Sequence, residues 1–308
     1  MPESPLGDEK VPEFTAESER SSAEPSKRLI GKILVNGSLA VQSKHFNQYL
    51  PLGKPRIIAA YLDQWGVDEI LIVDRCARGA DTHIDPALIA SVVETCRAPL
   101  TVGGGIKKVE HALALVKAGA DRVAINSGAI DHPLLMKQLA NTLGEQAVVA
   151  LVDVMQVAGE YRVYDYRENK ILGTNVVDWC EQLQGYGVGE FVINAVNRDG
   201  EGKGYELPVY QKLRDVLKVP LIASGGYGEP KHISDVLHRG VDGVAIGNSL
   251  HYSEHSMSTI KAKLARQDIR QAGIAYESEQ IGHFGRLLKL DDETLAHMLY
   301  QKREKCWL

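Results

Sequence analysis

The sequence has little of several features that mark particular classes of protein. Its four cysteines (Cys76, Cys96, Cys180 and Cys306) lie far apart and form no C-x-x-C pair, so neither a disulfide framework nor a zinc site is expected. No apolar run approaches the roughly 20 residues that a membrane-spanning helix needs. The acidic N-terminus also lacks the basic and then apolar order of a signal peptide. These absences predict a cytoplasmic protein with no membrane partner.

An excess of charge of one sign is also missing. The 308 residues include 35 basic and 40 acidic side chains, for a net charge of −5, so the sequence offers no general attraction to nucleic acid. Hydrophobic residues make up 44% of the chain and charged residues 24%, as in an ordinary globular protein. One large α/β barrel can absorb nearly all of this length. We therefore expect no nucleic-acid partner.

Composition divides the chain into three parts. Residues 1–26 are rich in Glu, Ser and Pro and have no apolar period, so we predict a disordered tail, with a docking peptide as the alternative. Residues 27–270 carry the pattern of an α/β domain. Residues 271–308 are predicted to be a C-terminal helical extension, in which DDETLAHMLYQKREK forms one amphipathic helix capped by Asp291 or Asp292.

Eight short β-branched runs alternate with helical stretches between residues 27 and 270. In order they read RLIGKILV, EILIVD, PLTVGGG, RVAIN, AVVALVD, EFVINAV, PLIASGG and GVAIG. Strands separated by helices of roughly 10–15 residues pair in parallel through βαβ crossovers. The pattern predicts an α/β fold that is either a closed barrel or an open doubly wound sheet.

The second half of this region repeats the first. Each repeated pair is separated by 121 positions, as Gly66 is from Gly187. Two equivalent half-barrels of four βα units each explain this offset, whereas an open sheet explains eight strands but not the register. We therefore predict a single (β/α)8 TIM barrel built from two half-barrel repeats. The recurring pairs are Gly66-Val67 and Gly187-Val188, Pro99-Leu100 and Pro220-Leu221, Gly119-x-Asp121 and Gly240-x-Asp242, and Ala124-Ile125 and Ala245-Ile246.

Glycine-rich strand ends also recur with this spacing. Glycine lets backbone N–H groups approach a phosphate closely, and the start of a following helix favours negative charge. One such segment alone is more typical of a tight turn. Two copies at symmetric positions predict a phosphorylated small-molecule substrate with a phosphate at each end. The predicted phosphate-binding residues are Gly104, Gly105, Asn126 and Ser127 in the first half, and Gly225, Gly226, Gly247 and Asn248 in the second.

Carboxylates follow three of the strands, where the functional end of a barrel lies. Asp153 ends the apolar run VVALVD and Asp199 follows EFVINAV. Asp153 is predicted to act in general acid/base catalysis, because it shares the mouth with the glycines. Asp74 ends LIVD, and capping a helix or forming a salt bridge is an equal alternative for it. We expect no cofactor, and no metal either, because the histidines lack metal-ligand spacing: His83, His111 and His132.

Charged residues precede four strands, at the opposite end of the barrel. Arg28, Glu69, Arg122 and Glu190 each stand just before an apolar run. Two positive and two negative side chains at strand starts fit one ring of ion pairs at the barrel bottom. The residues by themselves leave open whether such a ring is a plug or a gate.

The motifs from Lys27 to about residue 270 resemble the HisF family, the cyclase subunit of imidazole glycerol phosphate synthase. They are KRLIGKILV, GVDEILIVD, TVGGGI, GADRVAIN, QAVVALVD, NRDGEGKGYE, IASGGYG and GVDGVAIGNS. The resemblance implies a HisH-like glutaminase subunit docked at the barrel bottom and ammonia passing up through the barrel. It also implies that Arg28, Glu69, Arg122 and Glu190 form the ammonia gate, with Asp153 as a catalytic and Asp199 as a supporting aspartate.

Two positions depart from the cyclase pattern. Leu34 stands where the family has its first catalytic aspartate, and Gln42 replaces a phosphate-contacting lysine. Losing one member of an acid/base pair costs roughly 10² to 10⁴ in rate. The K-H-F…Y-L-P-L-G-K-P loop is similar to a HisF-like branch that serves acetamidino modification of nucleotide sugars for surface polysaccharide. That branch implies a further partner, an ATP-dependent sugar amidotransferase.

Three functions remain open from the sequence. The first is the ammonia-handling barrel of such a sugar-amidation system. The second is a divergent cyclase of histidine biosynthesis, in which Asp153 and another group share the acid/base work. The third is a non-catalytic scaffold that binds phosphates and organises partner proteins.

Overall fold

Eight strands close into a parallel barrel in the computed structural model of the chain. The structure describes residues 26–77, 82–264, 269–270, 276–281, 287–289, 291 and 293. Each strand pairs with the next and the last pairs with the first, so the ring has no edge. In order around the ring the strands are β1 (Arg28–Asn36), β4 (Glu69–Asp74), β5 (Leu100–Gly103), β6 (Arg122–Ile125), β7 (Val148–Val157), β10 (Glu190–Ala195), β11 (Leu221–Ser224) and β12 (Gly243–Ile246).

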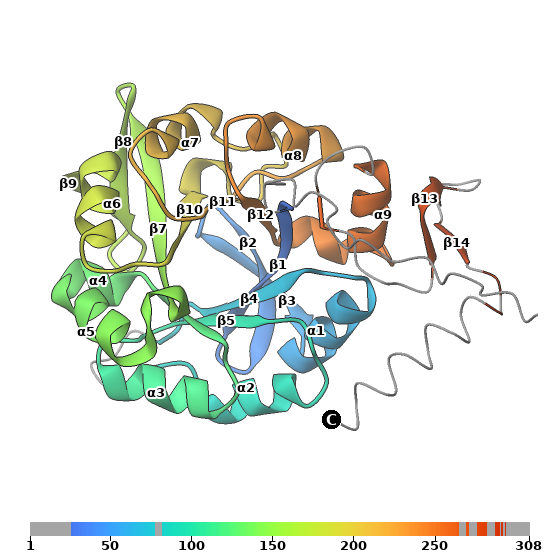
Figure 1. Cartoon of the computed structure of the whole chain (residues 1–308), viewed down its shortest axis with the longest axis horizontal. Coiled ribbons are helices and arrows are strands. Elements are labelled where there is room, and N and C mark those ends of the chain that lie inside the picture. The colour runs from blue at the N-terminus through green and yellow to red at the C-terminus, as the bar shows by residue number, and fades with distance from the viewer. Residues whose placement is uncertain are drawn as a thin grey trace, which may run out of the picture.

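Helices form an outer ring around these strands (Figure 1). Several start on local signals, as where the Asp85 side chain accepts a hydrogen bond from the Ala87 N–H at the start of the second helix. The helices are α1 (Pro55–Gln64), α2 (Pro86–Val93), α3 (Val109–Lys117), α4 (Ser127–Asp131), α5 (Leu134–Leu143), α6 (Val176–Gln184), α7 (Leu207–Arg214), α8 (Pro230–Leu237) and α9 (Ser256–Lys263). The described residues also form three 3₁₀ turns between strands and helices: η1 (Glu145–Ala147), η2 (Val196–Arg198) and η3 (Asn248–His251). The predicted (β/α)8 barrel is confirmed.

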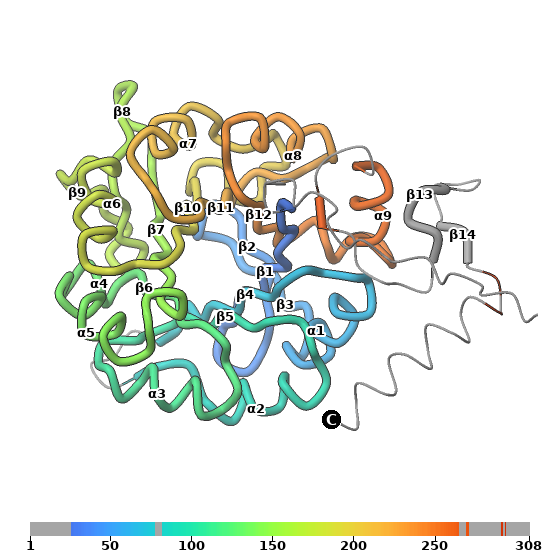
Figure 2. The backbone as a smooth tube through the Cα atoms, viewed as in Figure 1, coloured from blue at the N-terminus to red at the C-terminus, as the bar shows by residue number. Residues whose placement is uncertain are grey.

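The barrel consists of two similar halves, which the tube in Figure 2 traces from blue to green and from green to orange. Two strands follow the first strand of each half as antiparallel additions. The repeated Gly-x-Asp has a structural reason, because Asp121 and Asp242 accept hydrogen bonds from the backbone N–H groups of Leu100 and Leu221. The added strands are β2 (Leu39–Lys44) and β3 (Gln48–Gly53), and β8 (Glu160–Asp165) and β9 (Lys170–Asn175).

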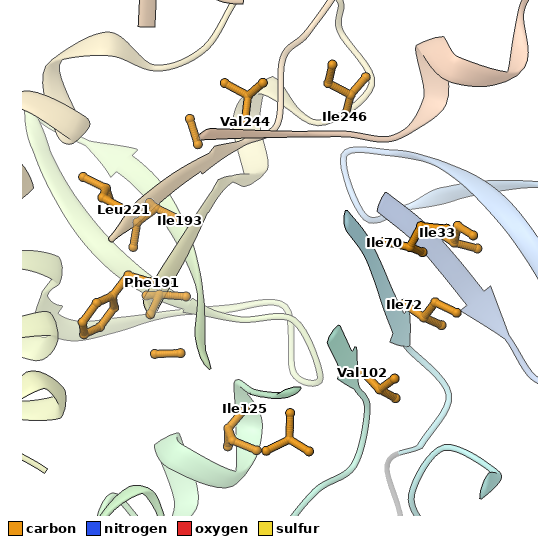
Figure 3. Packing of buried hydrophobic residues seen from close by; sticks show 14 of the residues in the cluster. Ile33, Ile70, Ile72, Val102, Ile125, Phe191, Ile193, Leu221, Val244 and Ile246 are labelled. Carbon is orange, nitrogen blue, oxygen red and sulfur yellow. The ribbon is translucent and has the colours of Figure 1, made fainter. Parts of the chain in front are cut away.

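Alternation along the barrel strands separates two apolar clusters. One packs the outward side chains, such as Ile33, Ile72 and Phe191, against the helices, as the close view in Figure 3 shows. The other fills the barrel interior and consists of Ile30, Leu71, Ala124, Val149, Leu151, Val192, Ile222 and Ala245. Alternate side chains of a strand point to opposite faces of the sheet. One set therefore packs against the helices, and the other set points into the barrel interior.

The ends of the chain are described only in part. All of the predicted tail (residues 1–26) except its last residue, and most of the predicted helix at 291–305, lie outside the described residues. Residues 269–270 return to the start of β1, where Lys27 and Ile269 form an isolated bridge. Beyond them two strands that the sequence did not predict, β13 (Tyr276–Ile281) and β14 (Leu287–Lys289), pair antiparallel. Among the described residues no helix is long and apolar enough to cross a membrane.

Candidate functional site: a charged ring and a divided mouth

Four charged side chains close a ring at the N-terminal end of the barrel. Arg28 donates to Glu69 at 2.6 Å and also pairs with Glu190. Arg122 donates to Glu190 at 2.9 Å and also pairs with Glu69. The side chains are 5–16% exposed, so each charge has two opposite partners and little water. The four side chains thus form the ring of ion pairs that their positions at the strand starts predict.

The electrostatics of the ring favour the charged form of Arg28. Burial lowers the pKa of Arg28, but the charges of Glu190 and Glu69 outweigh burial and leave this pKa above its ordinary value. Above the ring the interior is apolar except for Thr101, whose buried hydroxyl has no hydrogen-bond partner among the described residues. The barrel interior thus runs from a fully paired charged layer into an apolar layer.

A second polar layer lies at the top of the interior. The Asp153 carboxylate accepts hydrogen bonds from Asn126 at 2.6 Å and from Asn194 at 2.9 Å. The Asn194 side-chain oxygen in turn accepts from Lys32 at 3.0 Å and from Ser224 at 2.8 Å. One connected network therefore spans side chains from β1, β7, β10 and β11 together with the residue that follows β6.

The pKa of Asp153 is raised to about 6. Burial, which leaves 4% of the residue exposed, is the main cause because it disfavours the charged form. The positive charge of Lys32 and the hydrogen bonds from Asn194 and Asn126 act in the opposite direction. A carboxyl with a pKa near neutrality can exchange a proton at physiological pH, as general acid/base chemistry requires.

Asp199 lies on the other side of the mouth from Asp153. It follows η2, is 9% exposed and accepts a hydrogen bond from the Ser43 hydroxyl at 2.7 Å. It lines the larger of two cavities at the mouth, whereas Asp153 lines the smaller one. The two predicted catalytic aspartates therefore face different parts of the mouth.

Leu34 occupies the symmetric counterpart of the Asp153 position. Leu34 pairs in register with Val73, and Asp153 pairs with Asn194, which is the repeat mate of Val73. Leu34 lines both cavities, so the structure puts an apolar side chain where a second carboxylate would face Asp153. Gln42 donates a hydrogen bond to the backbone oxygen of Asn248 at 3.3 Å, so its amide is engaged at the rim.

The predicted phosphate-binding residues all lie at the mouth, but the cavities beside the two halves differ in volume. The half with Gly225, Gly226, Gly247 and Asn248 borders a cavity of about 620 Å³. The half with Gly104, Gly105, Asn126 and Ser127 borders one of about 50 Å³, narrowed by Phe46, Tyr49 and Tyr166. The repeat in the sequence therefore does not produce two equal sites.

Backbone conformation explains the glycines in these segments. Gly105 and Gly226 are repeat mates with φ of +66° and +116°, and a Cβ on either would lie 2.2 Å from a backbone oxygen. The asparagine side chains are engaged elsewhere, because Asn126 donates to Asp153 and Asn248 donates to the Ser43 backbone oxygen. The groups at these segments that remain open to a ligand are therefore backbone N–H groups and the Ser127 hydroxyl, which are the groups that the predicted phosphate sites need.

The remaining residues named in the sequence analysis are one aspartate and three histidines, and each has a defined position in the structure. Asp74 accepts a hydrogen bond from the Cys76 N–H at 2.7 Å and also lines the smaller cavity, and burial raises its pKa. The ring centroids of His83 and His111 lie 4.3 Å apart, and His132 is the first residue after α4. No group of three or more potential metal ligands occurs in the described part of the chain.

Two features of the mouth are not among the sequence-based predictions. The first is Lys32. A charged residue at an inward position of an apolar strand is a signal in the sequence that indicates such a residue. The β2–β3 hairpin was not expected to cover the mouth. Its contacts include His45 to Glu201 at 2.7 Å and the Tyr49 ring to the Arg75 guanidinium at 3.9 Å. A local pattern of alternating residues predicts neither contact, because both partners lie far away in the sequence.

Comparison with known proteins agrees with this geometry. The sequence model described as histidine biosynthesis protein matches residues 28–256. A Vibrio vulnificus protein named as the hisF2 subunit of imidazole glycerol phosphate synthase is 35% identical, over 84% of this chain and 97% of the relative. The HisF subunit of Exiguobacterium sibiricum is 33% identical over 79% and 98%. That of Pyrococcus furiosus is 30% identical over 79% and 97%.

Proposed function

The chain belongs to the histidine biosynthesis protein family and, within it, to the HisF-type subunits, and from this premise we propose that it is the ammonia-receiving barrel of a glutamine-dependent amidotransferase. A HisH-like glutaminase docks on the end that carries the charged ring. Ammonia enters there, passes along the apolar interior and leaves at the mouth, where a phosphorylated ligand is held.

The closed ring of Arg28, Glu69, Arg122 and Glu190 carries this proposal. Burying four charges is costly unless each is paired, and an apolar plug of similar volume stabilises a barrel at least as well. The stability of the barrel therefore does not require a charged ring at this position. It supports a function that needs a polar entrance to the barrel, and delivery of a small polar molecule such as ammonia is such a function.

The acceptor that we propose is the acetamido group of a nucleotide sugar, converted to an acetamidino group for surface polysaccharide. In this reaction a separate ATP-dependent sugar amidotransferase activates the acetamido oxygen, and the nitrogen of ammonia replaces it. Leu34 supports this proposal because it removes one of the two carboxylates that the cyclase uses. The barrel then delivers ammonia without carrying out ring closure itself.

A reconstitution tests the proposal. The chain is combined with the HisH-type glutaminase and the ATP-dependent amidotransferase of the same genome, with glutamine, ATP and an acetamido nucleotide sugar. We expect glutamate and amidated product in a ratio near unity. Glu190→Gln removes one charge of the ring and should raise this ratio by releasing ammonia to solvent. Lys231→Ala, which removes an exposed pair with Asp235 on α8, is the matched control. An equal ratio in wild type and Glu190→Gln contradicts the conduit.

The cyclase of histidine biosynthesis is the second candidate, and the names of the relatives favour it. Asp153, with its pKa of about 6, and Asp199 would be its acid/base groups. Complementation of a bacterium that lacks its own HisF separates the two candidates. We expect no growth without histidine, because losing one of two proton-transferring groups costs roughly 10² to 10⁴ in rate. Growth that is abolished by Asp153→Asn would establish the cyclase instead.

A scaffold that binds phosphates without handling ammonia is the third candidate. It predicts that Glu190→Gln leaves the glutamate-to-product ratio unchanged and that removing the chain affects only assembly of the other proteins. The unequal cavities at the mouth are compatible with it, but the ring is not explained by it. The reconstitution therefore discriminates between the conduit and the scaffold in a single measurement.

A further inference from the structure

Lys32 lies at the centre of the mouth, where the two cavities meet. It lines both of them, as do Leu34 and Phe46. Its side chain starts on β1 and reaches acceptors on β10 and β11. Between them lie β12 and the residue after it, whose cavity-lining residues are Ala245 and Gly247. Small residues on β12 leave room for a long side chain to cross the end of the barrel interior.

The ammonium group of Lys32 is held by a built set of acceptors. It donates to the Asn194 oxygen at 3.0 Å and to the Ser224 hydroxyl at 3.5 Å. Asn194 and Ser224 are both fully buried. Asp153 adds a negative charge to the set, because Asn194 donates to it and the Lys32 charge acts on it. Buried oxygens beside a carboxylate form a site that favours a small cation.

This acceptor set lies at the top of the interior, directly above the apolar cluster that contains Val192, Ile222 and Ala245. A neutral ammonia molecule that leaves this cluster meets the oxygens of the set first. If the set were empty, it would bind the molecule as an ammonium ion, because a nearby carboxylate favours the protonated form. An ammonium ion has no free electron pair and cannot attack an electrophile.

We propose that Lys32 is the selectivity residue at the upper end of the barrel interior: its own ammonium group fills the acceptor set of Asn194, Ser224 and Asp153, so that an ammonium ion cannot bind there and ammonia leaves as the neutral molecule. This inference rests on the proposed conduit and deepens it. The lysine charge also repels any cation that approaches from the mouth, since like charges disfavour one another.

The test uses ammonium binding by the chain alone. Lys32→Ala vacates the set, and ammonium chloride should then bind in a saturable way that sodium chloride of equal ionic strength does not reproduce. At ten times the dissociation constant the unfolding equilibrium constant should fall about tenfold. Wild type should show no such difference between the two salts. Absence of ammonium-specific stabilisation in Lys32→Ala overturns the inference.

Two further variants keep the test decisive. Lys32→Met fills the volume without charge and should not bind ammonium, so that binding by this variant would place the site elsewhere and overturn the inference. If Lys32→Ala does not fold, Lys32→Ser keeps a hydroxyl for Asn194 and leaves the cavity open, and the same salt comparison applies to it.

The reconstituted system gives an independent readout. Lys32→Ala should raise the glutamate-to-product ratio, and Lys32→Arg, which keeps a cation in the set, should restore a ratio nearer to wild type. An unchanged ratio in Lys32→Ala, with Glu190→Gln still raising it, overturns the selectivity role while the conduit stands. An unchanged ratio in both variants overturns the conduit as well, so the two failures are distinguishable.

Discussion

The buried Asp153 carboxylate has three neighbours that favour its charged form. Its two carboxylate oxygens each accept one amide hydrogen bond, from Asn126 and Asn194, and Lys32 lies within electrostatic reach. Burial still prevails and raises the pKa to about 6. An acid whose pKa is raised on folding stabilises the folded protein fully below its unfolded pKa, and this contribution is lost as the pH rises through the folded pKa.

The first prediction follows from this shift. The difference in unfolding free energy between wild type and Asp153→Asn should change in favour of the variant as the pH rises from about 4 to about 7. The change should be on the order of 1–3 kcal/mol, since each unit of pKa shift corresponds to about 1.4 kcal/mol. Urea unfolding at several pH values measures it. All other titrating groups are common to both proteins, so a pH-independent difference would contradict the raised pKa.

At the scale of elements, the β2–β3 hairpin ties the mouth together. The Ser43 hydroxyl donates to Asp199 at 2.7 Å, and the Ser43 backbone exchanges two hydrogen bonds with the Asn248 side chain. At its tip Phe46 packs on Tyr164 with 6.4 Å between ring centroids. One short hairpin thus contacts strand β8 and the segments after β10 and β12, and its Phe46 and Tyr49 line the cavities of the mouth.

The second prediction concerns this hairpin. Ser43→Ala leaves a buried oxygen of Asp199 without its hydroxyl donor, and a loss of this kind costs about 1–3 kcal/mol. Amide hydrogens of residues 39–53 should exchange faster in the variant. Thr142→Ala, which removes a hydroxyl bonded within α5, is the control and should leave the hairpin unchanged. Equal exchange in Ser43→Ala and wild type would show that the hairpin is held by its other contacts.

At the scale of the whole molecule, the two halves of the barrel share strands and helices but not the details of their rims. Both carry the glycine-rich segments, yet aromatic side chains from the added strands and loops occupy the first half. The ring at the bottom joins residues from both halves, Arg28, Glu69 and Arg122 from the first and Glu190 from the second. At the bottom, residues of both halves therefore form one shared ring, whereas at the mouth the two halves border cavities of different size.

The third prediction concerns the stability that the ring contributes. Glu190→Ala leaves two buried arginines to share one glutamate, and breaking a buried pair in this way costs about 3–5 kcal/mol. Urea unfolding at neutral pH should show a loss of this size. Lys231→Ala on the surface should change the free energy of unfolding by no more than about 0.5 kcal/mol. A loss as small as that of the control would mean that the ring is not held together as a unit.

The fourth prediction concerns phosphate binding at the mouth. Inorganic phosphate should bind at both glycine-rich segments, with higher affinity in the half that borders the 620 Å³ cavity than in the half that borders the 50 Å³ cavity. In a titration followed by backbone amide NMR, the signals of Gly226, Gly247 and Asn248 should shift first. Those of Gly105 and Ser127 should follow at higher concentration. The reverse order, or no shift in either set, would contradict this assignment.

Much of this protein is determined by its sequence alone. Eight apolar runs with helices between them, repeated after 121 residues, require a closed barrel of two halves. Positions at strand starts then place four charged residues at one end of the barrel, and positions at strand ends place Asp153 and the glycines at the other. The four are Arg28, Glu69, Arg122 and Glu190. These conclusions depend on local periodicity and on the rule that parallel strands point the same way.

How the mouth is occupied depends on packing in the folded chain. Whether Lys32 reaches Asn194 depends on the small residues of β12 between them, and whether the two glycine-rich halves stay open depends on where Phe46 and Tyr49 fall. These contacts join side chains that are distant in the sequence. No periodicity records them, because it fixes the direction of a side chain but neither its reach nor the space that its neighbours across the barrel leave free.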